Sequence, residues 1–280
     1  MTNAFDAWVG REEERTEWIQ PSAVTAMAAT LDMDSAPAQG QPLPPGWQWM
    51  YFNPVVRRSG LGTDGHPQRG GFLPPIELPR RMWAGSRLRY LADVPIGAKA
   101  TRRSLIHKVE NKVGKRGSLW FVTVEHVISC DGKPCIMEEQ DIVYRDATPP
   151  SAAPAPAPEV YDGQAQWSRE VLPDTTLLFR YSALTFNGHR IHYDQPYARN
   201  EEGYLGLVVH GPLTATLLQQ FALEHGGGRA LATFDFRGVS PLFVGRPFKL
   251  EGRQAQDGGL TLWARGPDGD LAMSASAMFR

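Results

Sequence analysis

Cysteine, net charge and long apolar runs are all scarce in this sequence of 280 residues, and each shortage excludes a class of protein. The two cysteines, Cys130 and Cys135, flank an apparent Asp131-Gly132 turn, so we expect reduced strand residues and no disulfide-rich secreted domain. The formal net charge of −1 argues against a broad basic surface for nucleic acid or an anionic membrane.

Hydrophobic segments are equally short. No stretch approaches the roughly 18 apolar residues that a membrane helix needs. The N-terminus MTNAFDAWVGREEERTEW contains acidic residues and no apolar core, unlike a signal or transit peptide. We therefore expect a cytoplasmic protein that binds neither nucleic acid nor membranes, with 42% hydrophobic residues to build its core.

A proline-alanine tract divides the chain. Residues 147–158 read ATPPSAAPAPAP and cannot form a helix or a central strand, because proline fixes φ and lacks an N–H donor. Such a tract prefers extended geometry at about 3.1 Å per residue and could span roughly 35 Å. The sequence therefore predicts two domains, residues 1–146 and 159–280, joined by a linker.

The two halves carry a faint internal repeat. Each has strand-like runs on both sides of a DG turn, at Asp131-Gly132 in the first half and at Asp268-Gly269 in the second. Alternating apolar and polar residues around such turns indicate antiparallel hairpins. Each half should therefore end in a meander of about three strands.

Each half also offers an apolar helix that begins with proline. In the second half Pro212 begins PLTATLLQQFALEHGGG, whose apolar residues have helical spacing and which Gly226 ends. In the first half either Pro45 or Pro21 begins it. An antiparallel sheet curled round one helix is an α+β arrangement that fits a hot-dog fold, and two copies give a tandem double hot-dog. Residues 53–80, rich in glycine and proline, predict a functional lid or binding loop.

Ionisable groups gather between Tyr181 and Asp194, in YSALTFNGHRIHYD. His192 can exchange protons near neutral pH, whereas Asn187 can hold a water or a carbonyl but cannot carry a proton. A structural histidine at a turn is the simpler alternative. His189, His192 and Asp194 have metal-ligand chemistry, but their spacing matches no recognised zinc pattern, so we expect neither a metal nor a cofactor.

His210-Gly211-Pro212 is the second candidate element. Amides at a helix N-terminus stabilise an oxyanion, and Gly211 would supply the donor because Pro212 has no N–H. A plain helix start is the alternative interpretation.

Together these stretches resemble a known family. SALTFNGHRIHYDQPYA and GLVVHGPL resemble the hydratase motif of MaoC-like enoyl-CoA hydratases, roughly D-x-N-P-x-H-x-D followed by G-x-x-x-H-G. Without a gap, His192 falls on the catalytic histidine and Asp194 on the aspartate after it. Asn187 takes the place of the catalytic aspartate, His189 that of the asparagine and Arg190 that of the proline. One of two proton carriers is thus replaced by a residue that cannot ionise.

The form ALTFN-x-H-x-IHYD is more similar to the type 2 hydroxyacyl-thioester dehydratases and to the 3-methylfumaryl-CoA (mesaconyl-CoA) and itaconyl-CoA hydratases. LPPGWQWMYF, LGTDGHP, GGFLPP and LPRRMWAGSRLRY in the first half look like signatures of the same group. The resemblance implies a hydro-lyase that adds water to a 2-enoyl-CoA. It favours itaconyl-CoA or 3-methylfumaryl-CoA as the substrate and citramalyl-CoA as the product.

We also predict that the catalytic residues come from the second half only, because the first half has no counterpart of N-x-x-x-x-H-x-D, and that the first half shapes the acyl pocket. The resemblance implies the following roles in the second half. His192 would activate water and Asn187 would orient it, while either His192 carries both proton steps or Asp194 assists. Arg190 is the nearest cation by sequence for a distal carboxylate. The remaining candidates for oxyanion or substrate binding are Gly211, His210, His189 and Tyr193.

Three alternatives stay open. The chain could be a 3-hydroxyacyl-thioester dehydratase of fatty-acid type. A hot-dog thioesterase usually relies on an acidic residue on or near the central helix, where the sequence has Glu224, far from Gly211. A non-catalytic acyl-thioester binding protein would leave His192 unexplained. A homodimer is also open.

Overall fold

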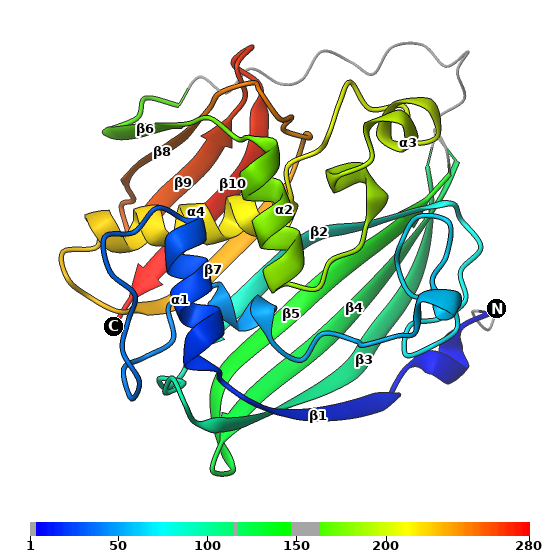
Figure 1. Cartoon of the computed structure of the whole chain (residues 1–280), viewed down its shortest axis with the longest axis horizontal. Coiled ribbons are helices and arrows are strands. Elements are labelled where there is room, and N and C mark those ends of the chain that lie inside the picture. Colours follow the sequence, from blue (N-terminus) through cyan, green and yellow to red (C-terminus); the bar gives the residue numbers. More distant parts are fainter. Residues whose placement is uncertain (1–3, 115–116, 147–162) are drawn as a thin grey trace.

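Ten antiparallel strands form one continuous sheet in the computed structural model, which describes residues 4–114, 117–146 and 163–280 (Figure 1). The predicted linker at 147–158 lies outside these ranges, and the domain boundaries stay a prediction. The first half contains, in chain order, η1 (Asp6–Trp8), β1 (Glu12–Trp18), α1 (Pro21–Thr30), η2 (Trp47–Met50), η3 (Arg58–Gly60), β2 (Arg80–Tyr90), β3 (Lys99–Gly114), β4 (Gly117–Cys130) and β5 (Lys133–Arg145).

The second half repeats this arrangement of strands. Its elements are β6 (Trp167–Val171), α2 (Thr175–Leu184), η4 (Arg190–His192), α3 (Gln195–Asn200), α4 (Gly211–His225), β7 (Leu231–Gly238), β8 (Phe248–Gln254), β9 (Leu260–Arg265) and β10 (Leu271–Phe279). The strand order β1-β3-β4-β5-β2 continues into β7-β10-β9-β8-β6, which is the same order reversed. This confirms the tandem double hot-dog and both predicted meanders.

The two halves join edge to edge where β2 pairs with β7. Gly85 lies at an irregularity of the β2–β5 register and pairs with Arg237 across the junction. A Cβ atom on Gly85 would lie 2.2 Å from the carbonyl oxygen of Phe236, so the junction has no room for a larger residue there.

The predicted hairpins also hold. Asp131 and Gly132 both have positive φ, 48° and 75°, which matches the twist of a two-residue hairpin between β4 and β5. Cys130 and Cys135 on these strands are free thiols. Burial raises the pKa of Cys130 to about 12, which keeps that thiol protonated.

The halves differ in their helices. Helix α4 begins at Gly211 and spans 15 residues, as Pro212 and Gly226 predict. In the first half Pro21 begins α1, which lies beside α2 (Figure 1). Pro45 precedes only the four-residue η2, because Gly46 adopts a left-handed φ of 84° that stops a helix from continuing through it. No long helix takes the place of α4 among the described residues of the first half.

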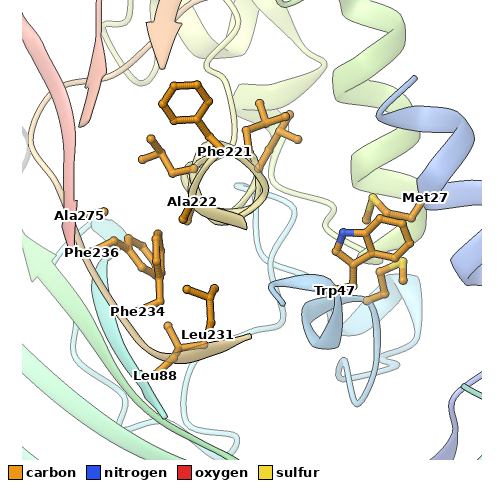
Figure 2. Close-up of a cluster of buried hydrophobic side chains, with 14 of the residues drawn as sticks. Met27, Trp47, Leu88, Phe221, Ala222, Leu231, Phe234, Phe236 and Ala275 are labelled. Atoms are coloured by element: carbon orange, nitrogen blue, oxygen red, sulfur yellow. The ribbon is translucent and has the colours of Figure 1, made fainter. Parts of the chain in front are cut away.

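One apolar cluster contains residues of both halves. Figure 2 shows Ala222 of α4 on the side of the helix toward Phe234 of β7 and Phe221 on the opposite side, with Leu88 of β2 below and Trp47 to the right. These residues are at most 2% exposed, so the sheet junction and the central helix share one core. No helix in the described part of the chain has the length and apolarity to cross a membrane.

Burial in this core predicts a large effect for a single leucine of α4. Leu218 is fully buried, whereas Leu172 is 65% exposed. Leu218→Ala should lower the free energy of unfolding by about 2–5 kcal/mol, because it removes apolar contacts and leaves a cavity. Leu172→Ala is the matched control and should change it by less than about 0.5 kcal/mol. Urea unfolding of both variants tests this, and equal effects would contradict the assignment of α4 to the core.

Candidate active site

A cavity of about 1470 Å³ opens between the two halves. Its walls come from residues 53–80, from β2, β4 and β5 of the first half, and from α2, the motif after it and the start of α4 in the second. Its lining includes Asn187, His189, His192, Tyr193 and Gly211 of the predicted site. The sequence motif and the predicted binding loop therefore meet in one place.

A tight turn after α2 aims the motif into this cavity. Helix α2 ends at Leu184, and Phe186 takes a positive φ of 49°. The Oδ1 atom of Asn187 accepts a hydrogen bond of 3.0 Å from the His189 amide. This use of Oδ1 leaves the side-chain NH₂ of Asn187 as the group that can donate to a bound water or carbonyl.

His192 has the geometry of a general base. It is 8% exposed, and its Nδ1–H donates a 2.8 Å hydrogen bond to the carbonyl of Val208. Because a carbonyl can only accept, this bond fixes the tautomer and leaves Nε2 with a lone pair. Burial lowers the pKa of His192 to about 4. The ring is thus neutral at pH 7 and able to take a proton.

His210 lies behind His192 and outside the cavity lining. The two rings stack with centroids 3.6 Å apart and planes 20° from parallel. His210 is fully buried and its Nε2 lies 2.8 Å from the Ser182 hydroxyl. Burial lowers the pKa of His210 well below the usual value, so this ring is neutral. Its stacking against His192 restricts the orientation of the His192 ring.

Helix α4 begins beside this pair. Gly211 is its first residue, and the first amides of a helix lack intrahelical acceptors. These donors and the positive end of the helix dipole suit a developing negative charge. The predicted oxyanion role of Gly211 therefore agrees with its place in the cavity lining.

Two predicted site residues have other partners. Asp194 caps α3 by accepting from the Tyr197 amide at 3.1 Å, and its other oxygen pairs with Arg190 at 2.7 Å. Arg190 also lies over the Tyr197 ring, 4.1 Å from its centroid. Neither side chain lines the cavity. Their contacts hold the motif loop in place, and the catalytic role of Asp194 stays a prediction.

The structure adds two residues that the sequence analysis missed. Asp64 and His66, in the segment 53–80 of the first half, lie against His189, with the His66 and His189 ring centroids 4.2 Å apart. The signal was LGTDGHP, a stretch that resembles the family but was given no chemical role. Because this stretch lies far from the motif in the sequence, its contact with His189 could not be predicted.

Glycine makes this contact close. Gly65 has a left-handed φ of 87°, and a Cβ there would lie 2.0 Å from the Gly188 carbonyl oxygen. The Arg190 amide donates 2.9 Å to the Asp64 carbonyl beside it, and the Arg190 guanidinium donates to that of Thr63. The first-half loop is thus bonded directly to the hydratase motif.

His189, His192 and Asp194, which the sequence analysis considered as metal ligands and did not favour, are not among the possible metal-binding groups of the described residues, and Asp194 is paired with Arg190. Asp64, His66 and His189 do present ligand atoms within 4.8 Å of one another and could hold a divalent ion. The Asp64 carboxylate, however, already accepts from His66 Nδ1 at 3.2 Å and from the His66 amide at 3.0 Å. These bonds describe an aspartate–histidine pair.

Solved structures share this architecture. A MaoC-like dehydratase superposes with a TM-score of 0.74 at 14% identity, covering 99% of each chain. A Mycobacterium tuberculosis protein described as having a double hot-dog fold gives 0.62 at 13% identity, covering 96% of this chain and 95% of the other. At these identities the likeness shows the fold, which is that of the MaoC-like hot-dog proteins.

Sequence comparison defines the family. The model of the family "hydroxyacyl-thioester dehydratase type 2" matches residues 46–244, and the chain belongs to this family. A protein of Chloroflexus aurantiacus named mesaconyl-C(4)-CoA hydratase is 50% identical over 273 residues, 96% of each chain. The protein is a hydro-lyase, an enzyme that adds or removes water.

The contact between Gly65 and Gly188 generates a prediction. Gly65→Ala combines an unfavourable φ with a backbone clash, and a displacement of about 1 Å at Asp64 and His66 can cost roughly 100-fold in rate. Gly10 has the same φ, 86°, with open space around it, so Gly10→Ala is the matched control. Both variants should lose some stability, but only Gly65→Ala should lose activity. Equal activities would show that the close approach is unimportant.

Proposed function

We propose that the protein catalyses the reversible hydration of a 2-enoyl-CoA, and that its acyl group is a branched C5 dicarboxylic one such as itaconyl or 3-methylfumaryl. The observation that carries the reaction is the neutral, buried His192, which lines the cavity together with Gly211 of α4 and whose Nδ1–H bond to Val208 leaves Nε2 with a lone pair. The sequence identity of 50% with a protein named mesaconyl-C(4)-CoA hydratase supports the substrate class.

The mechanism follows from these positions. Water held by the Asn187 amide gives a proton to His192 Nε2 while its oxygen bonds to the β-carbon of the substrate. The electrons of the double bond move toward the thioester carbonyl, and negative charge gathers on its oxygen. The amide of Gly211 and the α4 dipole stabilise this charge, and one such donor is typically worth about 3–4 kcal/mol.

The distal carboxylate of the substrate needs a cation in the cavity. Arg190 is engaged by Asp194, so its predicted role in substrate binding has no support from the cavity lining. Arg81 of β2 lines the cavity, hydrogen-bonds with Tyr144 and acts electrostatically on His66 and His189. Within the described residues no carboxylate pairs with it. We therefore assign the carboxylate to Arg81.

Three other arginines of β2 and β3 are paired with carboxylates. Arg80 bonds to Glu202, Arg87 to Glu139 and Asp141, and Arg103 to Glu12. Glu224, the acidic residue of α4 considered for a thioesterase, pairs with Arg169 at 2.6 Å. The geometry therefore favours a hydratase.

A panel of enoyl-CoAs followed by mass spectrometry tests the reaction. Gain of water is the expected result, and release of free CoA without hydration would indicate a thioesterase instead. His192→Ala should lower kcat about 100- to 10,000-fold, the usual contribution of general acid–base catalysis. His107 is exposed, so His107→Ala should leave the rate unchanged. A loss under about tenfold in folded His192→Ala would overturn the assignment.

Arg81 predicts substrate selectivity. Arg81→Met should lower kcat/KM for itaconyl-CoA by at least about 100-fold and change it far less for crotonyl-CoA, because only the dicarboxylic substrate has a charge to pair. Arg190→Met is the control, and any loss it causes should be similar for both substrates. Equal kcat/KM values for the two substrates in the unmodified protein would favour a straight-chain 3-hydroxyacyl-thioester dehydratase.

A further inference from the structure

Hydration needs a group that gives a proton to the α-carbon, and Asn187 cannot supply one. The lining carboxylates of the described residues are mostly engaged elsewhere. Glu138 accepts from Ser86 and Trp49, Glu202 accepts from Tyr197 and pairs with Arg80, and Glu13 pairs with Arg15. The Asp64 carboxylate is different, because its partner is a histidine that lines the same cavity.

Four histidines form a continuous row at this place. His66 lies 4.2 Å from His189 between ring centroids, His189 lies 5.6 Å from His192, and His192 stacks on His210. Burial lowers the pKa of His189 to about 2, that of His192 to about 4 and that of His210 well below its usual value. An extra proton is therefore poorly held at these three rings.

His66 differs from them through Asp64. Its Nδ1–H donates 3.2 Å to Asp64 Oδ2, while its own amide donates 3.0 Å to Asp64 Oδ1. Burial lowers the pKa of His66, but the hydrogen bond and the charge of Asp64 oppose this fall. Burial also acts to raise the pKa of Asp64, yet the bonds and charge of His66, together with the charge of Arg81, outweigh it and hold that pKa well below its ordinary value. Of the four rings, His66 is therefore the one where a carboxylate opposes the loss of a proton.

We propose that the Asp64–His66 pair of the first half is the second proton carrier of the site, in place of the carboxylate missing at position 187. This assignment rests on the proposed hydration. His66 is the catalytic residue, and Asp64 is the positioning residue that orients its ring and stabilises the imidazolium.

The proton balance closes with these groups. Water loses a proton to His192 Nε2 as the C–O bond forms at the β-carbon, and the π electrons move to the α-carbon and the thioester. The α-carbon then takes the proton from Nε2 of the His66 imidazolium, which becomes neutral. His192 then releases its proton to solvent and His66 takes one up from solvent, while His189 lies between the two rings. The net change is one water added and an unchanged enzyme.

The pH dependence follows from the charges around His66. Asp64 and Glu202 raise its pKa, and Arg81 of β2 lowers it. His189 and His192 lie near it in the motif loop, and protonation of either is disfavoured first by burial and then by the charge of neighbouring rings. Activity in the hydration direction should therefore fall as pH rises through the pKa of His66, because the imidazolium is lost.

Two variants test the pair. His66→Gln keeps a polar side chain without a proton carrier, and it should lower kcat about 100- to 10,000-fold with KM changed less than about threefold. Asp64→Asn keeps an acceptor for the His66 amide but removes the charge. It should lower kcat less and move the basic limb of the pH profile to lower pH, since the pKa of His66 falls. His107→Gln, at an exposed site of the same half, is the control.

Each outcome separates the two proposals. If the unmodified protein hydrates no enoyl-CoA, the proposed function fails. If it does, but His66→Gln keeps more than a tenth of kcat, or raises only KM, or Asp64→Asn leaves the basic limb in place, the proton-carrier role alone is overturned.

Dialysis against EDTA tests whether the three residues bind a metal instead. Activity lost there and restored by Zn²⁺ would make Asp64, His66 and His189 metal ligands and also overturn it, whereas unchanged activity supports the proposal.

Discussion

The close approach of Gly65 to the Gly188 carbonyl is the contact on which the site depends. Two peptide segments far apart in the sequence meet there without side chains between them. Asp64 and Arg190, one residue or two from the contact, are then bonded through their backbones. This places the Asp64–His66 pair beside His189. The two halves are also joined in the continuous sheet, where β2 pairs with β7 at another closely packed glycine, Gly85.

Burial then decides what the side chains at this contact can do. Desolvation disfavours a charged imidazole, so His189, His192 and His210 are neutral. A neutral ring whose tautomer is fixed by a carbonyl is a ready base but a poor acid. Burial also lowers the pKa of His66, but this ring has a carboxylate partner, Asp64. Under the proposed assignment His66 is the acid, and the two halves of the molecule would then contribute the two opposite proton functions.

Local sequence patterns predicted much of the fold and only part of the site. DG turns and the Pro212 helix start depend on neighbouring residues, and both were correct. The motif from Asn187 to His192 could also be found in the sequence, because a single tight turn sets its geometry. Contacts between residues far apart in the chain could not be predicted in this way. The short η2 depends on the φ of Gly46 beside α4, and the Asp64–His66 pair depends on where a long irregular segment packs.

The described residues of the first half include the short η2 and no helix as long as α4, and polar groups of this half such as Arg81 line the cavity. Arg81 lowers the pKa of His66 when its charge is unbalanced. A substrate carboxylate paired with Arg81 would offset that charge and raise the pKa of His66, so that the acid is strengthened when a dicarboxylic substrate is bound. If both proposals hold, one electrostatic interaction would link recognition of the distal charge to the protonation of His66.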